Sequence, residues 1–524
     1  MAEYLHPGVY IEEIERGPRP IEGVPTSTAA FLGEAERGPI TPRVVTSYKE
    51  YQRWFGDVFD QTRFLPYAAN GFFENGGRRA YICRIVGDAS VTAEAAFGDF
   101  IVRAAGPGGF GNRVFARISD GTTKKADGTS VGFRLQLAYW SGEVPAVDPF
   151  SPEGRRTLPR PAIAEDFDDL VTDESSPDYY GKRVPFVDLD KGDANQGSES
   201  SALGMLVRNA GVDPASRPAN AGALLQNGAD DEVVIGVDDY NGAIRGGRRT
   251  EQGLAALEKD PYRDVALVYA PNVTTDIAHA VITHCENMRF RFAVVDADKG
   301  QNDAGSIDPR STITDTEYAS FYYPWLVVSD PRTGARKLVP PGGYVLGVYA
   351  RSDNERGVFK APANEIVRGA LALEYDITDQ VQDVLNPKGV NAIRSFPGRG
   401  IRVWGARTMS SNALWKYNSV RRLFIFLERS IYEGTQWVVF EPNDDRLWAR
   451  VIDTIRLFLR SQWRLGALFG RTEQEAFFIT CDRTTMTQDD ILNGRLICEI
   501  GIAPVRPAEF VVFRIFQNTA EAQR

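Results

Sequence analysis

Apolar residues in the middle of this chain follow two spacings in turn. Residues 265–270 and 292–296 are short continuous apolar runs, which are typical of strands buried on both faces of a sheet. Between them a predicted helix begins at Thr275, its expected N-cap, and places four side chains on one face: Ile277, Val281, His284 and Met288. Strand, helix and strand in this order predict a right-handed βαβ unit, within an α/β stretch that spans residues 234–345.

The first part of the chain mixes several patterns. Residues 24–90 combine short strands with a helix in which aromatic side chains stand at helical spacing: Tyr48, Tyr51 and Phe55. Three runs between about residues 95 and 140 read as β-strands with Gly-rich turns between them: FIVRAAG, RVFARIS and VGFRLQLAYW. Residues 141–231 are rich in Pro, Asp and Gly and show little periodicity. We therefore expect a surface insertion with long loops and little core there.

The two ends of the chain differ from its middle. In residues 1–22, five Pro and Gly residues interrupt any helix, which predicts an extended arm. The last third is dense in aromatic, Gly and Arg residues. Its patterns predict helices at about 362–373, 411–433 and 444–465, and strands at 436–440, 476–481, 495–502 and 509–516.

Composition narrows the class of protein. The 524 residues leave room for about three or four domains, and no run of about 18 apolar residues is long enough to span a bilayer. The start of the chain has no basic stretch followed by an apolar one, so we expect no signal peptide and assembly in the cytoplasm. Four cysteines in a chain of this length do not form a disulfide framework, and isolated buried thiols are the expected state.

Charge argues against a nucleic-acid partner. The net charge is −10, whereas phosphate binding favours a basic surface. The charge is unevenly spread, with a balance of +3 over residues 341–524 and −13 over the rest of the chain. Such asymmetry is compatible with two surfaces that face different partners.

Two strings resemble catalytic motifs, and both fail on their context. Residues 106–111 satisfy GxGxxG, but a strand rather than a helix is predicted to follow them. Residues 128–132 satisfy GxSxG, but they connect a polar turn to a strand, so a hairpin turn is the better interpretation. The chain contains no Walker A loop.

Metal and histidine chemistry has equally weak support. His279 and His284 diverge by about 140° on one predicted helix, so they are poorly placed to share a metal. Asp296 and Asp298 follow an apolar strand and could hold Mg²⁺, but we favour a solvated turn. We therefore predict no cofactor, no metal and no catalytic residue.

A basic helix face is the first positive signal. In the predicted helix from about residue 444, five apolar side chains fall on one face: Leu447, Val451, Ile455, Phe458 and Leu459. Five arginines fall within a 120° sector on the other side: Arg446, Arg450, Arg456, Arg460 and Arg464. The sequence leaves two interpretations open, an ordinary solvated face or a ridge that docks on an acidic partner.

The chain ends supply the second positive signal. YLHPGVYIEEI near the N-terminus and AEFVVFRIFQNT near the C-terminus are both prone to form strands, and their candidate residues are Tyr4, Val9, Tyr10, Ile11, Phe510, Val512, Phe513 and Ile515. Both faces of the C-terminal strand would be mostly apolar. Two edge strands of one domain would account for the pattern, and so would arms that pair with another chain.

Several long stretches resemble contractile tail sheath proteins, the sheaths of contractile phage tails, R-type pyocins and related injection systems. The resemblance covers residues 1–90 and 234–517, and it rests on YLHPGVYIEEI, GFFENGGRRAYICRIVG, LNPKGVNAIRSFPGRGIRVWGARTMS and GRLICEIGIAPVRPAEFVVFRI, among other stretches. It implies stacked hexameric rings around an inner tube, with baseplate and tail-terminator proteins as further partners. It also implies that the ends are strand arms shared between subunits and that a C-terminal domain faces the tube.

The patterns and the resemblance together predict a multidomain α+β fold with a mixed-sheet core. Its expected parts are an N-terminal arm (1–22), a first core segment (24–90), an outer β-rich insertion (91–233), an α/β middle domain (234–345), a C-terminal core (346–505) and a C-terminal arm (506–524). A contractile sheath subunit without catalysis and without direct membrane insertion is the predicted function. A hydrolase that uses the α/β domain, or a non-contractile shell or baseplate protein, is the alternative.

Overall fold

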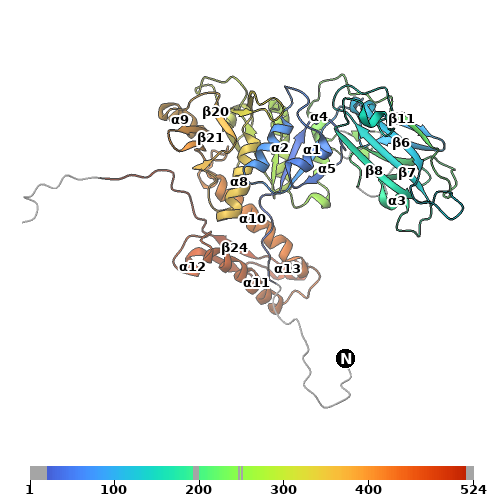
Figure 1. Ribbon diagram of the computed structural model, residues 1–524. Helices are drawn as coiled ribbons and strands as arrows, with labels where there is room; N and C mark the ends of the chain where they lie inside the picture. The colour runs from blue at the N-terminus through green and yellow to red at the C-terminus, as the bar shows by residue number, and fades with distance from the viewer. Residues whose placement is uncertain (1–19, 193–199, 243, 246–247, 250–251, 515–524) are drawn as a thin grey trace, which may run out of the picture. The chain divides into compact units, whose positions relative to one another are not determined.

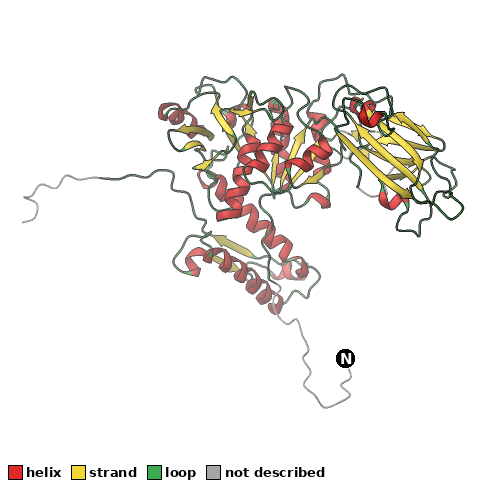
Figure 2. Ribbon diagram, viewed as in Figure 1, coloured by secondary structure: helices red, strands yellow, loops and turns green. Residues whose placement is uncertain are grey.

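The chain folds into two compact units, and each unit is defined by contacts among its own residues. The computed structural model describes residues 20–192, 200–242, 244–245, 248–249 and 252–514. The larger unit is Pro25–Arg421, and the smaller combines Met1–Val24 with Arg422–Arg524. Helices and strands alternate along both, which confirms the predicted mixed α+β class (Figure 2).

A nine-stranded sheet organises the larger unit (Figure 1). Its order is β19-β22-β21-β16-β15-β14-β1-β3-β2. The bounds are β19 (Glu365–Ile366), β22 (Gly400–Val403), β21 (Val390–Phe396), β16 (Ala319–Tyr323), β15 (Phe292–Asp296), β14 (Leu267–Tyr269), β1 (Ala29–Gly33), β3 (Ala80–Arg84) and β2 (Arg43–Val45). The six strands from β21 to β3 are parallel, and β2, β22 and β19 pair antiparallel at the two sides. The predicted βαβ unit is confirmed as β14, α6 (Thr275–Met288) and β15, although Thr274 rather than Thr275 is the N-cap.

Helices cover both faces of this sheet. Ala30 and Leu32 of β1 join a core cluster that includes Ile277 and Val281 of α6. Phe31 points to the opposite face, because side chains alternate along a strand, and its ring meets Phe72 of α2 (Leu65–Glu74) edge-on at 5.3 Å between ring centroids.

The helices α2 and α8 (Gly342–Arg356) pack closely because glycine lies where they meet. A Cβ atom added at Gly343 would lie 2.5 Å from the Cα of Ala68, and one added at Gly347 would lie 2.5 Å from the Cβ of Asn75. The run GGYVLG therefore serves close helix packing. The helix predicted at 362–373 is wrong, because Asn364 and Gly369 adopt left-handed backbone and the segment holds β19 and β20 (Ala370–Leu373) instead.

The segment between β3 and β14 forms a separate β-rich part with two four-stranded sheets (Figure 1). One sheet contains β4 (Glu94–Phe97), β5 (Phe100–Ala104), β10 (Gly204–Arg208) and β9 (Phe186–Asp188). The other contains β11 (Ala221–Leu224), β6 (Val114–Asp120), β7 (Phe133–Tyr139) and β8 (Ile163–Leu170). Tyr180 and Leu206 lie in their shared core, so the expectation that residues 141–231 hold little core is wrong. Short strands between Pro- and Gly-rich turns hid the periodicity.

The two ends of this β-rich part run side by side. Val91 and Ala229 exchange backbone hydrogen bonds of 2.8 and 3.1 Å, and Glu94 and Gln226 exchange bonds of 2.9 and 3.0 Å. We call this pairing the neck. The chain thus leaves the nine-stranded sheet after β3 and returns toward β14 through one short strand pair.

Smaller elements complete the larger unit. They are α1 (Tyr48–Phe55), α3 (Tyr180–Arg183), α4 (Val237–Asn241), β12 (Ile244–Arg245), β13 (Arg248–Arg249), α5 (Gly253–Leu257), α7 (Pro309–Thr312), β17 (Leu326–Ser329), β18 (Arg336–Val339) and α9 (Asp379–Leu385). The predicted helix with Tyr48, Tyr51 and Phe55 is confirmed as α1.

The C-terminal elements are α10 (Asn418–Gly434), α11 (Asp445–Arg464), α12 (Glu473–Ala476), β23 (Phe477–Thr480), α13 (Gln488–Leu492) and β24 (Glu499–Ile502). The helix predicted at 444–465 is confirmed as α11, whereas α10 begins seven residues later than expected. The strand predicted at 436–440 is wrong, since Gln436–Val438 forms a 3₁₀ turn. Residues 509–514 form no strand in the described part of the chain.

Candidate functional site

The helix α11 is fixed in place by its cap and its apolar face. The Asp444 carboxylate accepts hydrogen bonds from the backbone N–H groups of Arg446 (3.0 Å) and Leu447 (2.8 Å), which satisfies free donors of the first turn. All five predicted apolar residues of this helix are buried. Phe458 contacts the ring of Phe426 on α10, with 6.0 Å between centroids.

The arginine face of α11 is partly neutralised within the chain. The Arg460 guanidinium donates two hydrogen bonds of 2.7 and 3.2 Å to the Glu473 carboxylate, and this contact lowers the pKa of the Glu473 carboxyl. Arg450 pairs with Glu441 at 3.0 Å, and Arg456 lies 3.4 Å from Asp453. No ion pair of Arg446 or Arg464 is found among the described residues, and both side chains are exposed. These two arginines are therefore the most available for an outside partner.

The strands β23 and β24 form a two-stranded sheet whose outer edges lack a third strand in the described part of the chain. A single bridge between Leu468 and Pro504 touches one end of it. A lone pair of strands is marginal in water, and its free N–H and C=O groups can template a further strand. This small sheet can therefore accept extended segments from elsewhere.

Exposed apolar side chains accompany this sheet. Phe469, Phe478 and Leu492 are exposed, and none of the three was predicted as a site residue from the sequence. Phe478 could have been found from strand alternation, because Phe477 beside it is buried. This exposed apolar surface and the free edges of β23 and β24 both indicate a surface that binds a partner.

The structure describes only three of the predicted arm residues. Phe510, Val512 and Phe513 are 72, 77 and 84% exposed. Ile515 and the N-terminal residues Tyr4, Val9, Tyr10 and Ile11 lie outside the described residues. An apolar segment with this exposure is unfavourable in water unless another surface covers it.

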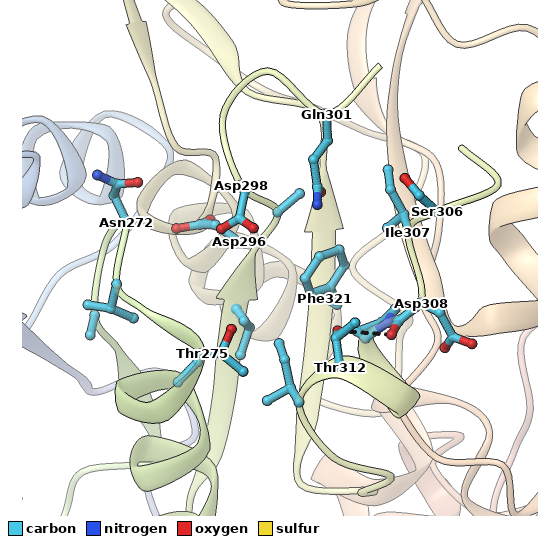
Figure 3. Close-up of a pocket in the computed structure, with 17 residues that line it drawn as sticks. Asn272, Thr275, Asp296, Asp298, Gln301, Ser306, Ile307, Asp308, Thr312 and Phe321 are labelled. Atoms are coloured by element: carbon cyan, nitrogen blue, oxygen red, sulfur yellow. Dashed lines mark hydrogen bonds between the residues drawn. The ribbon is translucent and has the colours of Figure 1, made fainter. Parts of the chain in front are cut away.

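The α/β part holds a cavity of about 170 Å³ at the carboxyl ends of β14 and β15. Figure 3 shows Asp296 and Asp298 on one wall, with Ser306 and Asp308 across from them. Asp296 accepts hydrogen bonds from the Tyr269 hydroxyl (2.5 Å) and from the Gly342 N–H (2.8 Å) at the start of α8. Burial raises the pKa of the Asp296 carboxyl to about 7. The solvated-turn interpretation is therefore wrong for Asp296, which ties β15 to α8.

Neither this cavity nor the two described histidines, His279 and His284, assemble a metal centre. Among the described residues, no group of three or more His, Cys, Asp or Glu side chains is placed to hold a metal ion. His284 is buried against Arg291, with 2.5 Å between Nε2 and the guanidinium, and burial lowers its pKa to about 3. Arg291 also donates hydrogen bonds to the carbonyls of Leu257 and Tyr262. The buried pair of His284 and Arg291 therefore has a structural role, because it links α6 to the segment 257–262.

Both catalytic-looking strings lie next to β-strands rather than at the start of a long helix, as predicted. The GxGxxG string runs into a 3₁₀ turn, Gly109–Arg113, and then into β6. The GxSxG string lies in the turn between β6 and β7, where Lys125 donates its N–H to the Thr129 carbonyl at 2.7 Å.

Within the described residues, the small sheet has open strand edges, and no cluster of His, Cys, Asp or Glu side chains is placed to hold a metal ion. Two family models match consecutive segments: the phage tail sheath protein central domain over residues 235–409 and the phage tail sheath C-terminal domain over residues 410–518. Together they span more than half of the chain. The chain belongs to the contractile tail sheath family, and the resemblance found in the sequence is confirmed.

Tail sheath proteins of two phages are similar to this chain, one over nearly its whole length and one over about half of it. It is 24% identical over 539 residues to the tail sheath protein of Burkholderia phage BcepMu, covering 98% of this chain and 96% of that protein. It is 22% identical over 316 residues to the tail sheath protein of Escherichia phage P2, covering 57% of this chain and 76% of that protein.

Solved sheath structures share the fold. The contracted PVC sheath complex of an extracellular contractile injection system has a TM-score of 0.58 at 23% identity, with full coverage of both chains. The contracted helical sheath of the anti-feeding prophage has a TM-score of 0.57 at 24% identity, covering 98% of this chain and 99% of that one. These structures show the shared fold, and the family models and the similar sheath proteins give the chain a structural role of the tail sheath type.

Proposed function

We propose that this protein polymerises as stacked hexameric rings around an inner tube and contracts to drive the tube through a target envelope. The observation that carries the proposal is the coexistence, in one chain, of an open two-stranded sheet and an exposed apolar end segment. The similar solved structures, which are sheaths in the contracted state, support it further. Baseplate and tail-terminator proteins are the remaining partners in this proposal.

Strand addition between subunits is the proposed link. The free edges of β23 and β24 offer unpaired backbone groups, and residues 1–22 and 506–524 supply the strands. Covering the exposed side chains of Phe510, Val512 and Phe513 would contribute roughly 1.5–3 kcal/mol each. An arm of twenty residues reaches on the order of 65 Å, so it stays paired while its own domain rotates.

Contraction requires no catalytic step in this proposal. The work comes from better subunit contacts in the final state, because packed interfaces switch between discrete arrangements. The lack of an assembled metal cluster or histidine centre in the described residues is compatible with a non-enzymatic role. None of the described helices is long and apolar enough to cross a membrane. We propose assembly in the cytoplasm, followed by release as part of a phage tail or tail-like particle.

Removal of the arms tests this link. A variant lacking residues 1–20 should remain folded and monomeric but form no cylinders in negative-stain micrographs. A variant ending at residue 508 should behave in the same way, and each should keep the circular dichroism spectrum of the full chain. Cylinders of normal length from either truncated chain would refute the arm proposal.

The proposed tube contact uses the two most available arginines of α11. We propose that Arg446 and Arg464 face an acidic tube surface, because the other three arginines of this face pair within the chain. Each exposed pair contributes only about 0.2–1 kcal/mol, but the contact repeats along the tube.

Charge reversal tests this contact directly. The double variant Arg446→Glu/Arg464→Glu should form sheaths that retain less tube protein after sedimentation. Arg483→Glu, at an exposed arginine outside α11, serves as the control and should retain tube normally. Tube retention equal to wild type in the double variant would show that this face is only solvated.

A further inference from the structure

Two cysteines stand opposite each other at one end of the β23–β24 sheet. The last paired positions of the ladder are Thr480 and Glu499. Cys481 follows the first of these and Cys498 precedes the second, so the same register places the two cysteines directly across from each other. The sequence predicts isolated thiols here, because four cysteines in a chain of this length do not form a disulfide framework.

The ladder also defines the type of pair that they form. At the other end, Ala503 donates its N–H to the Ala476 carbonyl at 2.9 Å, so that pair is a hydrogen-bonded one. Pair types alternate along an antiparallel ladder, which makes Cys481 and Cys498 a non-hydrogen-bonded pair. Cα atoms in such pairs lie about 4.5 Å apart, within the range of about 4.4–6.8 Å that a disulfide requires.

The side chains agree with the backbone register. The two side chains lie close enough for each thiol to shift the pKa of the other. Cys481 shares the face of buried Phe477 and is only 2% exposed, whereas Cys498 is half-buried. Burial raises the pKa of the Cys498 thiol to about 12 and also raises that of Cys481. Both thiols therefore react slowly, and Cys498 is the one that solvent reaches.

We propose that Cys481 and Cys498 form a redox-sensitive pair that closes into a disulfide when the protein meets a low-molecular-weight disulfide oxidant. The Cys498 thiolate attacks one oxidant sulfur, forms a mixed disulfide and releases one thiol. The Cys481 thiolate then attacks the Cys498 sulfur and expels the second thiol. Two cysteine thiols are oxidised, the oxidant is reduced to two thiols, and the two protons pass to those thiols.

The bond would clamp the small sheet from one end. It closes the loop of residues 482–497 and prevents β23 and β24 from separating. In a reducing cytoplasm the pair stays open, and an oxidising environment outside the cell closes it. The bearing of this clamp on assembly rests on the proposed function, in which neighbouring arms add to the same sheet.

Peptide mapping of the full-length protein tests the pair without any assembly. Reduced protein is incubated with oxidised glutathione, its free thiols are alkylated, and trypsin is added. Trypsin cuts after Arg483 and Arg495 but not after Arg506, which Pro507 follows, so a disulfide joins two otherwise separate peptides, 472–483 and 496–514. We expect this linked species to become dominant and to disappear on reduction. Cys83 and Cys285, both buried, serve as internal controls and should be recovered unlinked.

Two single variants separate the steps. Cys481→Ser should accumulate a lasting glutathione adduct on Cys498, and Cys498→Ser should accumulate almost none on Cys481. Oxidation should raise the apparent Tm of the wild-type protein by at least about 5 °C and leave both variants unchanged. A stable glutathione adduct on wild-type Cys498, or recovery of both thiols fully alkylated, would overturn the inference. Failure of the protein to form cylinders would count only against the proposed function.

Discussion

Two opposing effects meet at the Asp296 carboxyl. Hydrogen bonds from the Tyr269 hydroxyl and the Gly342 N–H favour its ionised form, whereas burial favours its neutral form. Burial is the larger effect and raises the pKa from 3.8 to about 7. The folded protein therefore binds more protons than the unfolded chain between about pH 4 and pH 7. The stability from this group is present below pH 4 and is lost as the pH rises through 7.

The substitution Asp296→Asn removes this titration. A shift of about three pKa units corresponds to about 4 kcal/mol at 1.36 kcal/mol per unit, which is the cost of the ionised carboxylate at pH 8. Between pH 6 and pH 8 the wild-type protein should lose about 1.4 kcal/mol from this group. The amide oxygen of Asn can still accept from Gly342, while the altered bond to Tyr269 costs about 1 kcal/mol. We expect the variant to be more stable than wild type at pH 8 by about 2–3 kcal/mol.

Urea unfolding at pH 6, 7 and 8, followed by tryptophan fluorescence, measures the difference. Trp325 reports nearby, because its indole N–H donates to the Ala297 carbonyl at 2.7 Å. The wild-type urea midpoint should fall as the pH rises. Between pH 6 and pH 8 the free energy of unfolding of Asp296→Asn should fall by about 1.4 kcal/mol less than that of the wild-type protein. Tyr269→Phe is the control and should be less stable than wild type at every pH. A less stable Asp296→Asn protein at pH 8 would refute the reasoning, since the charge would then stabilise the start of α8.

Two further predictions concern packing. Gly343→Ala places a Cβ against the backbone of α2 and should lower the Tm by several degrees, whereas Gly142→Ala meets nothing within 4 Å and should leave it unchanged. Equal melting curves for both variants would show that the helices separate at little cost. Deletion of residues 141–231 should give insoluble or protease-sensitive protein, because it removes four strands of the β-rich part, whereas deletion of 92–228 should leave a soluble chain. A protease-resistant product of the shorter deletion would contradict the shared core of the two sheets.

Strong local patterns predicted their elements well. The helix α11 carries five apolar residues at helical spacing and a capping Asp444, so its residues alone determine its bounds. The strand β15 is a continuous apolar run, as central parallel strands are. In both cases the signal lies within the element itself.

Elements that depend on remote contacts were missed. The residues Gly342–Ser352 of α8 are buried on all sides, so this helix shows no polar face, and its glycines are explained only by the approach of α2. The position of β1 between β3 and β14 joins residues more than 200 positions apart. No local spacing contains that information.

In the candidate site, too, local spacing was predictable from the sequence and remote contacts were not. Helical spacing placed the five arginines on one face, but Glu473 and Glu441 lie outside the helix, and only the structure shows which arginines they neutralise. The opposed thiols were missed for the same reason, because register decides which residues of two strands meet.

The neck has a consequence for how such a chain can change over time. Because Val91 and Ala229 pair directly, both ends of the β-rich part leave the rest of the larger unit at one place. A different domain whose own ends lie close together could replace it there without any added loop-closure entropy. The nine-stranded sheet would keep its register, since β3 and β14 already flank β1. The neck is therefore a site at which one inserted domain can be replaced by another while the nine-stranded sheet is retained.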